Sequence, residues 1–471
     1  MRLTMAVTDP TIELDPAAVR ELERSFRGQV LRPIDPRYDE ERRVWNGSIN
    51  RFPALIARCA GVADVRAVVR FAQQTGLATA VRSGGHSFPG LSVCDGGIVI
   101  DLSSMTGIRV DPDARTARVQ AGALLSDLDR ETQEFGLAVP AGVVSHTGVA
   151  GLTLGGGIGW LMRKHGLTID QLLAVDLVTA DGQFVKASAT ENSELFWGLR
   201  GGGGNFGIVT EFEFQLNPVG PILLAGPIFW PMEDSPDVLR FYREWIANAP
   251  DELTTIVFHR RAPALPGVPV DVRGRLVVVV GCCYAGPVEA GEDVVRQLRE
   301  FGSPLLDLCA PMPFTALQTM LDPSFSPGWR YYMRSCDVAE LTDDVIDITA
   351  EHALRMTSPR TTFPIFHQGG AVAQVADHDT AFNGRSAGHS INVTAITETA
   401  RGFDEECEWA RGLWSALAPH QTSVYVNFLM DEGEERIRAA YGAQKYARLK
   451  ALKHRYDPDN FFRLNQNIPP G

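Results

Sequence analysis

The chain has 471 residues, of which 45% are hydrophobic and 21% charged, and it carries a formal net charge of −13. This composition is typical of a folded globular protein, and the length allows more than one domain. A surface with this excess of negative charge repels phosphate backbones and anionic lipids, so we expect neither nucleic acid nor a membrane among the partners.

The sequence shows no recognisable targeting segment, disulfide framework or metal-binding motif. The first ten residues hold no apolar run long enough for a signal peptide, and no segment approaches ~20 uninterrupted apolar residues. The seven cysteines are irregularly spaced, which does not suggest a disulfide framework. Asp377-His378-Asp379 is typical of a polar loop rather than a zinc ligand set, so we expect no metal. Together these features favour a cytoplasmic location.

Short helices and strands alternate through the first half of the chain. Residues 1–45 are expected to form a helical lead-in that starts near Asp15-Pro16. Apolar periodicity then predicts helices at 62–75, 124–135 and 194–199 and strands at 78–81, 97–102, 116–121 and 208–214. The pattern indicates an α+β fold.

The texture changes after residue 217, where prolines become frequent. There we expect a helix at 238–249 and strands at 276–284 and 391–396, and near the C-terminus a strand at 423–428 and a helix within 436–455. We therefore predict domains at 46–217 and 218–421, followed by a C-terminal segment at 422–471.

Three glycine-rich segments punctuate the first domain, at 82–90, 142–159 and 200–207. Glycine lets the backbone approach a ligand closely and lets amide groups converge on oxyanions. Three such loops in one domain favour a large phosphate-bearing ligand, although tight turns alone are the plainer alternative.

Two common nucleotide-binding motifs do not fit these loops. Residues 202–207 match G-x-G-x-x-G, but a helix precedes them and a strand follows, the reverse of a Rossmann loop. No P-loop motif is present, and Ser87 lacks the second glycine of a nucleophile elbow.

The glycine segments and the tail resemble a known family. Arg82-Ser-Gly-Gly-His86-Ser resembles the flavin-attachment loop of the berberine bridge enzyme-like oxidases. Residues 148–160, the loop Leu195-Phe-Trp-Gly-Leu-Arg-Gly-Gly-Gly-Gly-Asn205 and the tail 456–470 resemble the family's other signatures, in the same order.

The resemblance implies a bipartite fold of the vanillyl-alcohol-oxidase (PCMH) type. A domain at 46–217, joined by the C-terminal segment, would bind FAD, and a substrate domain with a large antiparallel sheet covered by helices would face it. The positions that match the family's FAD-binding residues are Arg82, Ser83, Gly84, Gly85, His86, Ser87, Gly142, Ser145, Gly148, Gly151, Gly155, Gly207, Ile208, Val209, Asn427 and Asn465.

The resemblance also implies a covalent flavin. In the family the histidine matched by His86 is bonded to the flavin 8α-methyl group, and neutral imidazole is a competent nucleophile near pH 7. Many relatives add a bond from a cysteine to flavin C6. Val144 occupies that position here, so we expect one covalent link, 8α-histidyl, and no cysteinyl link.

Tyr425 matches the family's catalytic tyrosine and is the expected base, with Gln374 at the position where some relatives carry a catalytic glutamate. Glutamine is no base, which shifts the task to Tyr425. In the predicted strand at 423–428, Tyr425 and Asn427 would share one face. An ordinary phenol, with a pKa near ~10, is a poor base at pH 7. We therefore expect His389 and Gln374, from neighbouring strands, to lower it.

His146 and Thr147 leave the fate of oxygen open. The family places the position of Thr147 near the edge of the flavin that reacts with O2, and 142–148 is similar to the enterocin-pathway type of flavin oxygenase, which oxygenates a polyketide. The sequence thus predicts an oxidase of a small organic molecule, an alcohol or a phenolic or polyketide product, that uses O2. The alternative functions are an oxygenase, a flavin carrier without turnover, and an NAD(P)-dependent dehydrogenase of the same fold class. For Thr147 itself the alternative is a packing role in its loop.

Overall fold

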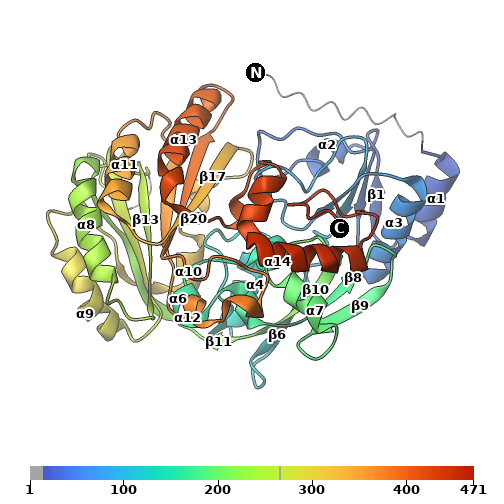
Figure 1. Cartoon of the computed structure of the whole chain (residues 1–471), viewed down its shortest axis with the longest axis horizontal. Coiled ribbons are helices and arrows are strands. Elements are labelled where there is room, and N and C mark those ends of the chain that lie inside the picture. The colour runs from blue at the N-terminus through green and yellow to red at the C-terminus, as the bar shows by residue number, and fades with distance from the viewer. Residues whose placement is uncertain (1–13, 265–266) are drawn as a thin grey trace.

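The computed structural model describes residues 14–264 and 267–471, so the N-terminal residues inspected for a signal peptide lie outside it. Two regions lie side by side, one built on small sheets and one on a single large sheet (Figure 1). Helix α14 (Glu434–Tyr456), near the C-terminus, runs along the first region.

A four-stranded sheet in the order β1-β2-β4-β3 opens the first region. Its strands are β1 (Gln29–Leu31), β2 (Leu55–Arg58), β4 (Ile98–Asp101) and β3 (Thr79–Arg82). The predicted helix at 62–75 is α3 (Val62–Thr75), which connects β2 to β3 as parallel neighbours of β4. The purely helical lead-in was wrong. Helix α1 (Pro16–Ser25) starts at Asp15 as expected, but β1 then pairs with β2 because three residues of the lead-in extend the sheet edge.

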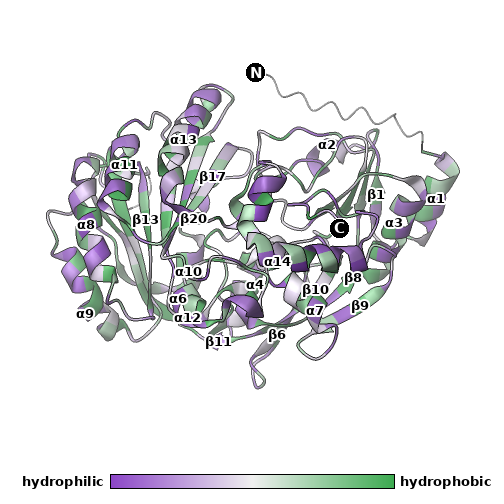
Figure 2. Cartoon of the chain, viewed as in Figure 1, coloured by the Kyte–Doolittle hydropathy of each residue, from purple (hydrophilic) through white to green (hydrophobic). Residues whose placement is uncertain are grey.

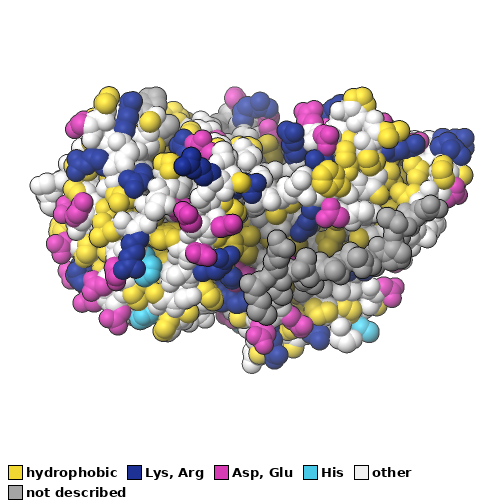
Figure 3. All heavy atoms as spheres, turned by 90° about the horizontal axis from the view of Figure 1, so that it is seen from above, with side chains coloured by type: hydrophobic (Ala, Val, Ile, Leu, Met, Phe, Trp, Pro, Cys, Tyr) yellow, Lys and Arg dark blue, Asp and Glu magenta, His cyan; other side chains and the backbone are white. Residues whose placement is uncertain are grey.

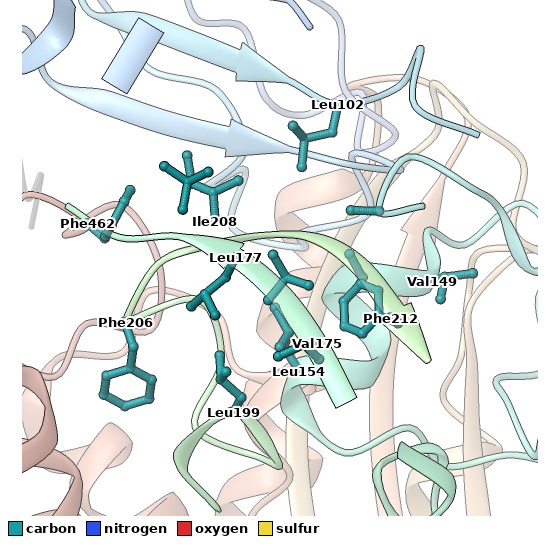
Figure 4. Close-up of a cluster of buried hydrophobic side chains, with 14 of the residues drawn as sticks. Leu102, Val149, Leu154, Val175, Leu177, Leu199, Phe206, Ile208, Phe212 and Phe462 are labelled. Carbon is teal, nitrogen blue, oxygen red and sulfur yellow. The ribbon is translucent and has the colours of Figure 1, made fainter. Parts of the chain in front are cut away.

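The second sheet of this region has five strands, in the order β5-β6-β10-β8-β9. They are β5 (Ile108–Asp111), β6 (Thr116–Gln120), β10 (Ile208–Gln215), β8 (Leu172–Val178) and β9 (Phe184–Ser188). Helices α4 (Leu125–Gln133), α5 (Val149–Gly155) and α7 (Ser193–Leu199) pack in the same region. Figure 4 shows Leu177, Phe206, Phe212 and Phe462 in the core they share, so the C-terminal tail is part of it.

Shorter elements connect these units. They are α2 (Tyr38–Glu41), β7 (Leu137–Ala138), α6 (Met162–His165), η1 (Thr168–Gln171), β11 (Asn217–Pro218), η2 (Met232–Asp234), η3 (Asp322–Ser324), α12 (Ala371–Gln374), η4 (Asp377–Asp379) and η5 (Ala418–His420). The predicted domain boundary after residue 217 falls within β11, which pairs with β7.

The second region is one nine-stranded sheet with antiparallel pairing, confirming the α+β fold with a large antiparallel sheet. Its strands are β12 (Ile222–Pro231), β13 (Leu253–Arg261), β14 (Leu276–Tyr284), β15 (Leu306–Asp307), β16 (Ala310–Pro313), β17 (Arg330–Val338), β18 (Thr362–His367), β19 (His389–Thr397) and β20 (Gln421–Ser423). The strands predicted at 276–284 and 391–396 are β14 and most of β19.

Four helices cover one face of the large sheet. They are α8 (Ser235–Ile246), α9 (Val288–Arg299), α11 (Asp343–Ala353) and α13 (Phe403–Leu417), while α10 (Phe314–Thr319) lies toward the first region beside α4. Figure 2 shows hydrophilic residues on the outer sides of the covering helices. Along β19, Ile391, Val393 and Ala395 pack under these helices. Because side chains alternate along a strand, Asn392 and Thr394 face the other way, toward the first region.

The strand predicted at 423–428 was wrong. Strand β20 ends at Ser423, and a single 3₁₀ turn, η6 (Val426–Phe428), follows. The amide of Phe428 donates to the carbonyl of Tyr425 at 3.0 Å, which closes the turn. The buried ammonium of Lys453 in α14 then donates to the carbonyls of Asn205 and Phe462, both at 2.9 Å, tying the tail to the third glycine loop.

The surface of one face mixes Lys and Arg with Asp and Glu (Figure 3). Within residues 14–264 and 267–471, no helix is long and apolar enough to cross a membrane. The same residues contain no group of three or more His, Cys, Asp or Glu side chains that could hold a metal ion.

Candidate active site

A cavity of about 360 Å³ lies between the two regions. One wall is built from the glycine segments and the C-terminal tail, and we call it the glycine wall. Its predicted members are Ser83, Gly84, Gly85, His86, Ser87, Gly142, Thr147, Gly148, Gly151, Gly207, Ile208, Val209, Tyr425, Asn427 and Asn465. The opposite wall, the sheet wall, comes from the large sheet and the loop before β17.

Backbone meets backbone in the glycine wall. A Cβ on Gly84 would lie 2.4 Å from the amide nitrogen of Gly148, and a Cβ on Gly148 would lie 2.5 Å from that of Gly84. Only glycine allows this approach. The loop of His86 is therefore seated directly on the start of α5, which brings two glycine segments distant in sequence to one surface of the cavity.

His86 is held by two aromatic neighbours. Its Nε2 shares a hydrogen bond of 2.8 Å with Nδ1 of His146, and its ring stacks on Trp45 with 4.5 Å between ring centroids. Burial, and secondarily His146, hold the pKa of His86 well below its ordinary value. Burial also lowers the pKa of His146, against the pull of Asp322. Both imidazoles are therefore neutral near pH 7, the state in which a ring nitrogen keeps its lone pair.

Four predicted residues of this region support the wall without lining the cavity. Arg82 donates to the buried carboxylate of Asp101 at 2.7 Å, which fixes the start of the His86 loop. Ser145 donates from its hydroxyl to Asp322 at 2.6 Å, so its side chain is engaged away from the cavity. Gly155 packs against the side-chain amide of Asn427. His146 forms a hydrogen bond with His86, which lines the cavity.

Tyr425 lines the cavity with only 3% of its surface exposed. Its hydroxyl oxygen accepts hydrogen bonds of 2.8 Å from the amide of Gly157 and from Nδ2 of Asn427. Both bonds favour the phenolate, but burial outweighs them and raises the pKa of Tyr425 to about 12. The expectation of a lowered pKa was therefore wrong, because burial of the phenol outweighs the two hydrogen-bond donors.

The two side chains expected to help Tyr425 lie elsewhere. Gln374 is exposed in the short helix α12, where its amide donates to Asp251 at 3.2 Å, so it is not on a strand beside the cavity. His389 stacks on His367, with 5.4 Å between centroids, and does not line the cavity. The placement of Gln374 in the catalytic set was wrong because its glycine-rich turn directs the chain into α12, beside α6.

No residue of the sheet wall was predicted individually, although the large antiparallel sheet was expected to face the FAD-binding domain. Its apolar members are Phe258, Leu321, Phe325, Met333, Pro364 and Phe366, and its polar members are Asn392 and Thr394. The alternation at 391–396 could have indicated these last two, because Asn392 and Thr394 are the polar residues of an otherwise apolar segment. Among the described residues that line the whole cavity, none is Asp, Glu, Lys or Arg.

Comparison with known proteins decides the family. Residues 53–188 match the model of an FAD binding domain, and residues 424–469 match the berberine and berberine-like model. An FAD-linked oxidoreductase of Dictyostelium discoideum is 33% identical over 96% of this chain and 97% of its own. The chain belongs to the berberine bridge enzyme-like family of FAD-linked oxidoreductases.

Further relatives have named activities. (R)-6-hydroxynicotine oxidase of Paenarthrobacter nicotinovorans is 32% identical over 95% of this chain and 97% of its own. The crystal structure of 6-hydroxy-D-nicotine oxidase from Arthrobacter nicotinovorans superimposes with a TM-score of 0.86, at 32% identity, and covers 95% of this chain and 99% of that one. This chain is thus an enzyme, an FAD-linked oxidoreductase that acts on organic small molecules.

The residues present fit FAD. The glycine wall offers backbone amides at the start of α5 and in the loop before β10, where close approach to a diphosphate needs no side chain. The carboxamide oxygen of Asn465 also lines the cavity, buried and without a partner among the described residues. A buried acceptor of this kind is complementary to a hydroxyl or imide N–H, both of which FAD carries.

Proposed function

We propose that this enzyme binds FAD through one covalent bond to Nδ1 of His86 and oxidises a small organic substrate, an alcohol or a phenolic or polyketide product, with O2 as the final electron acceptor. The observation that carries the proposal is the state of His86. Its Nε2 is engaged by His146, while no hydrogen bond among the described residues engages Nδ1. A neutral imidazole with one nitrogen free of hydrogen bonds among the described residues, at the wall of this cavity, is suited to the 8α link.

Each wall has its own task in this proposal. When bound, FAD would supply the two-electron acceptor for a substrate C–H, with O2 as the final acceptor. The glycine wall would hold the cofactor, and His146 would accept the hydrogen bond from Nε2 of His86, which keeps the Nδ1 lone pair of His86 available. Tyr425 holds the substrate O–H or N–H and takes its proton when deprotonated, with Gly157 and Asn427 stabilising the phenolate oxygen.

Acid precipitation tests the covalent bond. The wild type is expected to stay yellow in the pellet, with the chain mass increased by one FAD, whereas His86→Ala is expected to release its flavin into the supernatant. His378→Ala, at a side chain that is 86% exposed, is the matched control and should keep the colour. Release of all flavin from the wild type would refute the link, and a cysteinyl flavopeptide would refute the single bond inferred from Val144.

An oxygenase is the second candidate, favoured by Thr147. This residue lines the cavity next to His146, which contacts His86. If oxygen is transferred, turnover under ¹⁸O₂ should place the label in the product, whereas an oxidase places it in hydrogen peroxide alone. Turnover without oxygen uptake would instead favour a dehydrogenase with another acceptor.

We also propose that the domains divide at 46–217 and 218–421, with 422–471 returning to the first region, because the small sheets end with β11 and the large sheet runs from β12 to β20, whose last two residues cross the second boundary. The seven cysteines are all free and buried, which supports a cytoplasmic location.

A further inference from the structure

The sheet wall contains a polar group that the fold leaves without a partner. Asn392 is completely buried in β19 and lines the cavity. Neither its Nδ2 nor its Oδ1 has a hydrogen-bond partner among the described residues. A buried amide in this condition destabilises the fold unless a ligand or water completes it, so its presence needs an explanation.

The strand register explains why the protein itself does not complete it. Asn392 stands opposite Ser335 on β17, whose hydroxyl is also buried and without a partner. On the other side, the pairs Phe366–Ser390 and Thr362–Thr394 place Pro364 opposite Asn392, and proline has neither an amide hydrogen nor a polar side chain. Of these two neighbours only Ser335 has a polar side chain, and it makes no hydrogen bond with Asn392, so the amide stays open toward the cavity that it lines.

The surroundings of Asn392 restrict what could bind there. Phe258, Phe366 and Met333 line the same wall, and the described lining contains no Asp, Glu, Lys or Arg. An ionic substrate would lose its hydration without gaining a counter-charge, and a sugar would leave most of its hydroxyls unpaired. The wall thus fits a neutral, largely aromatic molecule with few polar atoms.

We propose that Asn392 is a specificity-determining residue that holds the substrate by an amide-like edge, in which a hydrogen-bond donor and an acceptor are separated by one atom, as in a lactam, a carboxamide or a 2-hydroxypyridine. Its Nδ2 donates to the acceptor while its Oδ1 accepts from the donor, a two-bond pairing that fixes the orientation of a flat ring against the sheet wall. This deepens the proposed function, on which it rests for the meaning of the cavity as a substrate site.

Ligand binding to the resting holoenzyme tests the proposal without turnover. The probes are 2-pyridone, which has the donor and the acceptor, and N-methyl-2-pyridone, which keeps only the acceptor, with binding followed by perturbation of the flavin spectrum. We expect the wild type to bind 2-pyridone roughly 10- to 100-fold more tightly, because the methylated probe leaves Oδ1 unpaired. In Asn392→Leu, of similar volume, the ratio of the two dissociation constants should fall to about 1.

Thr397→Val is the matched control on the same strand. Thr397 does not line the cavity and its hydroxyl donates to the carbonyl of Thr399 at 2.6 Å, so its loss should leave the ratio unchanged. Thermal unfolding separates ligand binding from a structural role. Asn392→Leu should be at least as stable as the wild type, because it removes an unpaired buried amide.

Three results would overturn the proposal. They are equal affinities for the two probes in the wild type, a discrimination that survives in Asn392→Leu, and a resting flavin spectrum altered by this substitution in the absence of probe, which would mean that Asn392 faces the cofactor. A failed covalent link or an absent oxidase activity would instead refute the proposed function and leave the probe ratio measurable on any FAD-loaded enzyme.

Discussion

The two walls of the cavity are made in different ways. The glycine wall is built by backbone approach, with Gly84 and Gly148 so close that neither tolerates a Cβ. The sheet wall is built by side chains on a regular antiparallel frame, where alternate residues of β13, β18 and β19 face the cavity and the rest pack under helices. A wall made of closely packed backbone has a shape that side-chain substitutions change little, which suits a constant cofactor. A wall made of side chains changes its shape and polarity with each substitution, which suits a varying substrate.

Gly84→Ala should break the first wall completely. The new Cβ would lie 2.4 Å from the amide nitrogen and 2.6 Å from the Cα of Gly148, and backbone atoms have no room to yield. We expect loss of FAD from the purified protein, measured as the ratio of absorbance at the flavin and protein bands. Phe258→Leu, on the sheet wall, should keep a full complement of FAD.

Gly412→Ala is the control for the same chemical change. It lies inside α13 with nothing within 4 Å of the added Cβ, and alanine favours a helix interior by roughly 0.5–1 kcal/mol. It should bind FAD normally and melt slightly higher. Stoichiometric FAD in Gly84→Ala would show that the two glycine segments separate easily and that the wall is not rigid.

Tyr425→Phe should have the next largest effect, on rate rather than on cofactor. A positioned proton-transfer group contributes roughly 10²- to 10⁴-fold, so stopped-flow flavin reduction should slow by that range. Because burial raises the pKa of Tyr425 to about 12, the deprotonated fraction grows across the accessible range, and the wild-type rate should rise with pH. In the Phe variant the remaining rate should be nearly flat with pH.

A milder change to the same site is Asn427→Leu, which keeps the Tyr425 hydroxyl and removes one of its two hydrogen-bond donors. It should slow reduction less and shift the rise to higher pH, because a donor that stabilises the phenolate is gone. If Tyr425→Phe reduced its flavin at the wild-type rate, Tyr425 would be a packing residue under the ring.

Sequence patterns predicted the elements that depend on neighbouring residues of the chain. The periodicity at 62–75 and 276–284 and the glycine segments depend on neighbours in sequence, and α3 and β14 have the predicted bounds. The alternation at 423–428 misled because tertiary bonds override it. Asn427 donates to the carbonyl of Leu152 and to Tyr425, and these bonds favour a turn over an extended strand.

The sheet wall was beyond local patterns for a different reason. The neighbours of Asn392 on the adjacent strands are Pro364 and Ser335, which lie 28 and 57 residues before it in the sequence. Which residues stand beside Asn392 is set by the register between the strands, and a local sequence pattern does not contain this register. The misplacement of Gln374 has the same origin, since resemblance gave its position in a motif but not the path of the chain after it.

The smallest predicted effect concerns a carboxyl group where the two regions meet. Asp129 of α4 is buried, and its Oδ2 accepts from Gln318 of α10 at 2.9 Å, while Gln318 also donates to the carbonyl of Gly142 in the glycine wall. Burial raises the pKa of Asp129 to about 7, against the opposing effect of Gln318. In the unfolded chain an aspartate has a pKa near ~3.9. The native state therefore binds the proton more tightly, and the stability from this group is lost as pH rises toward 7.

Asp129→Asn isolates that contribution. Between pH 5 and pH 7 the free energy of unfolding of the wild type should fall by about 2 kcal/mol relative to the Asn variant, measured by urea denaturation of the holoenzyme. Gln318→Leu supplies the comparison, because removing a donor to the carboxylate raises the pKa of Asp129 further and extends the loss of stability above pH 7. If the difference in the free energy of unfolding between wild type and Asp129→Asn stayed constant from pH 5 to pH 7, the Asp129 carboxylate would be hydrated. The contact between α4 and α10 would then be open to water and would not exclude it.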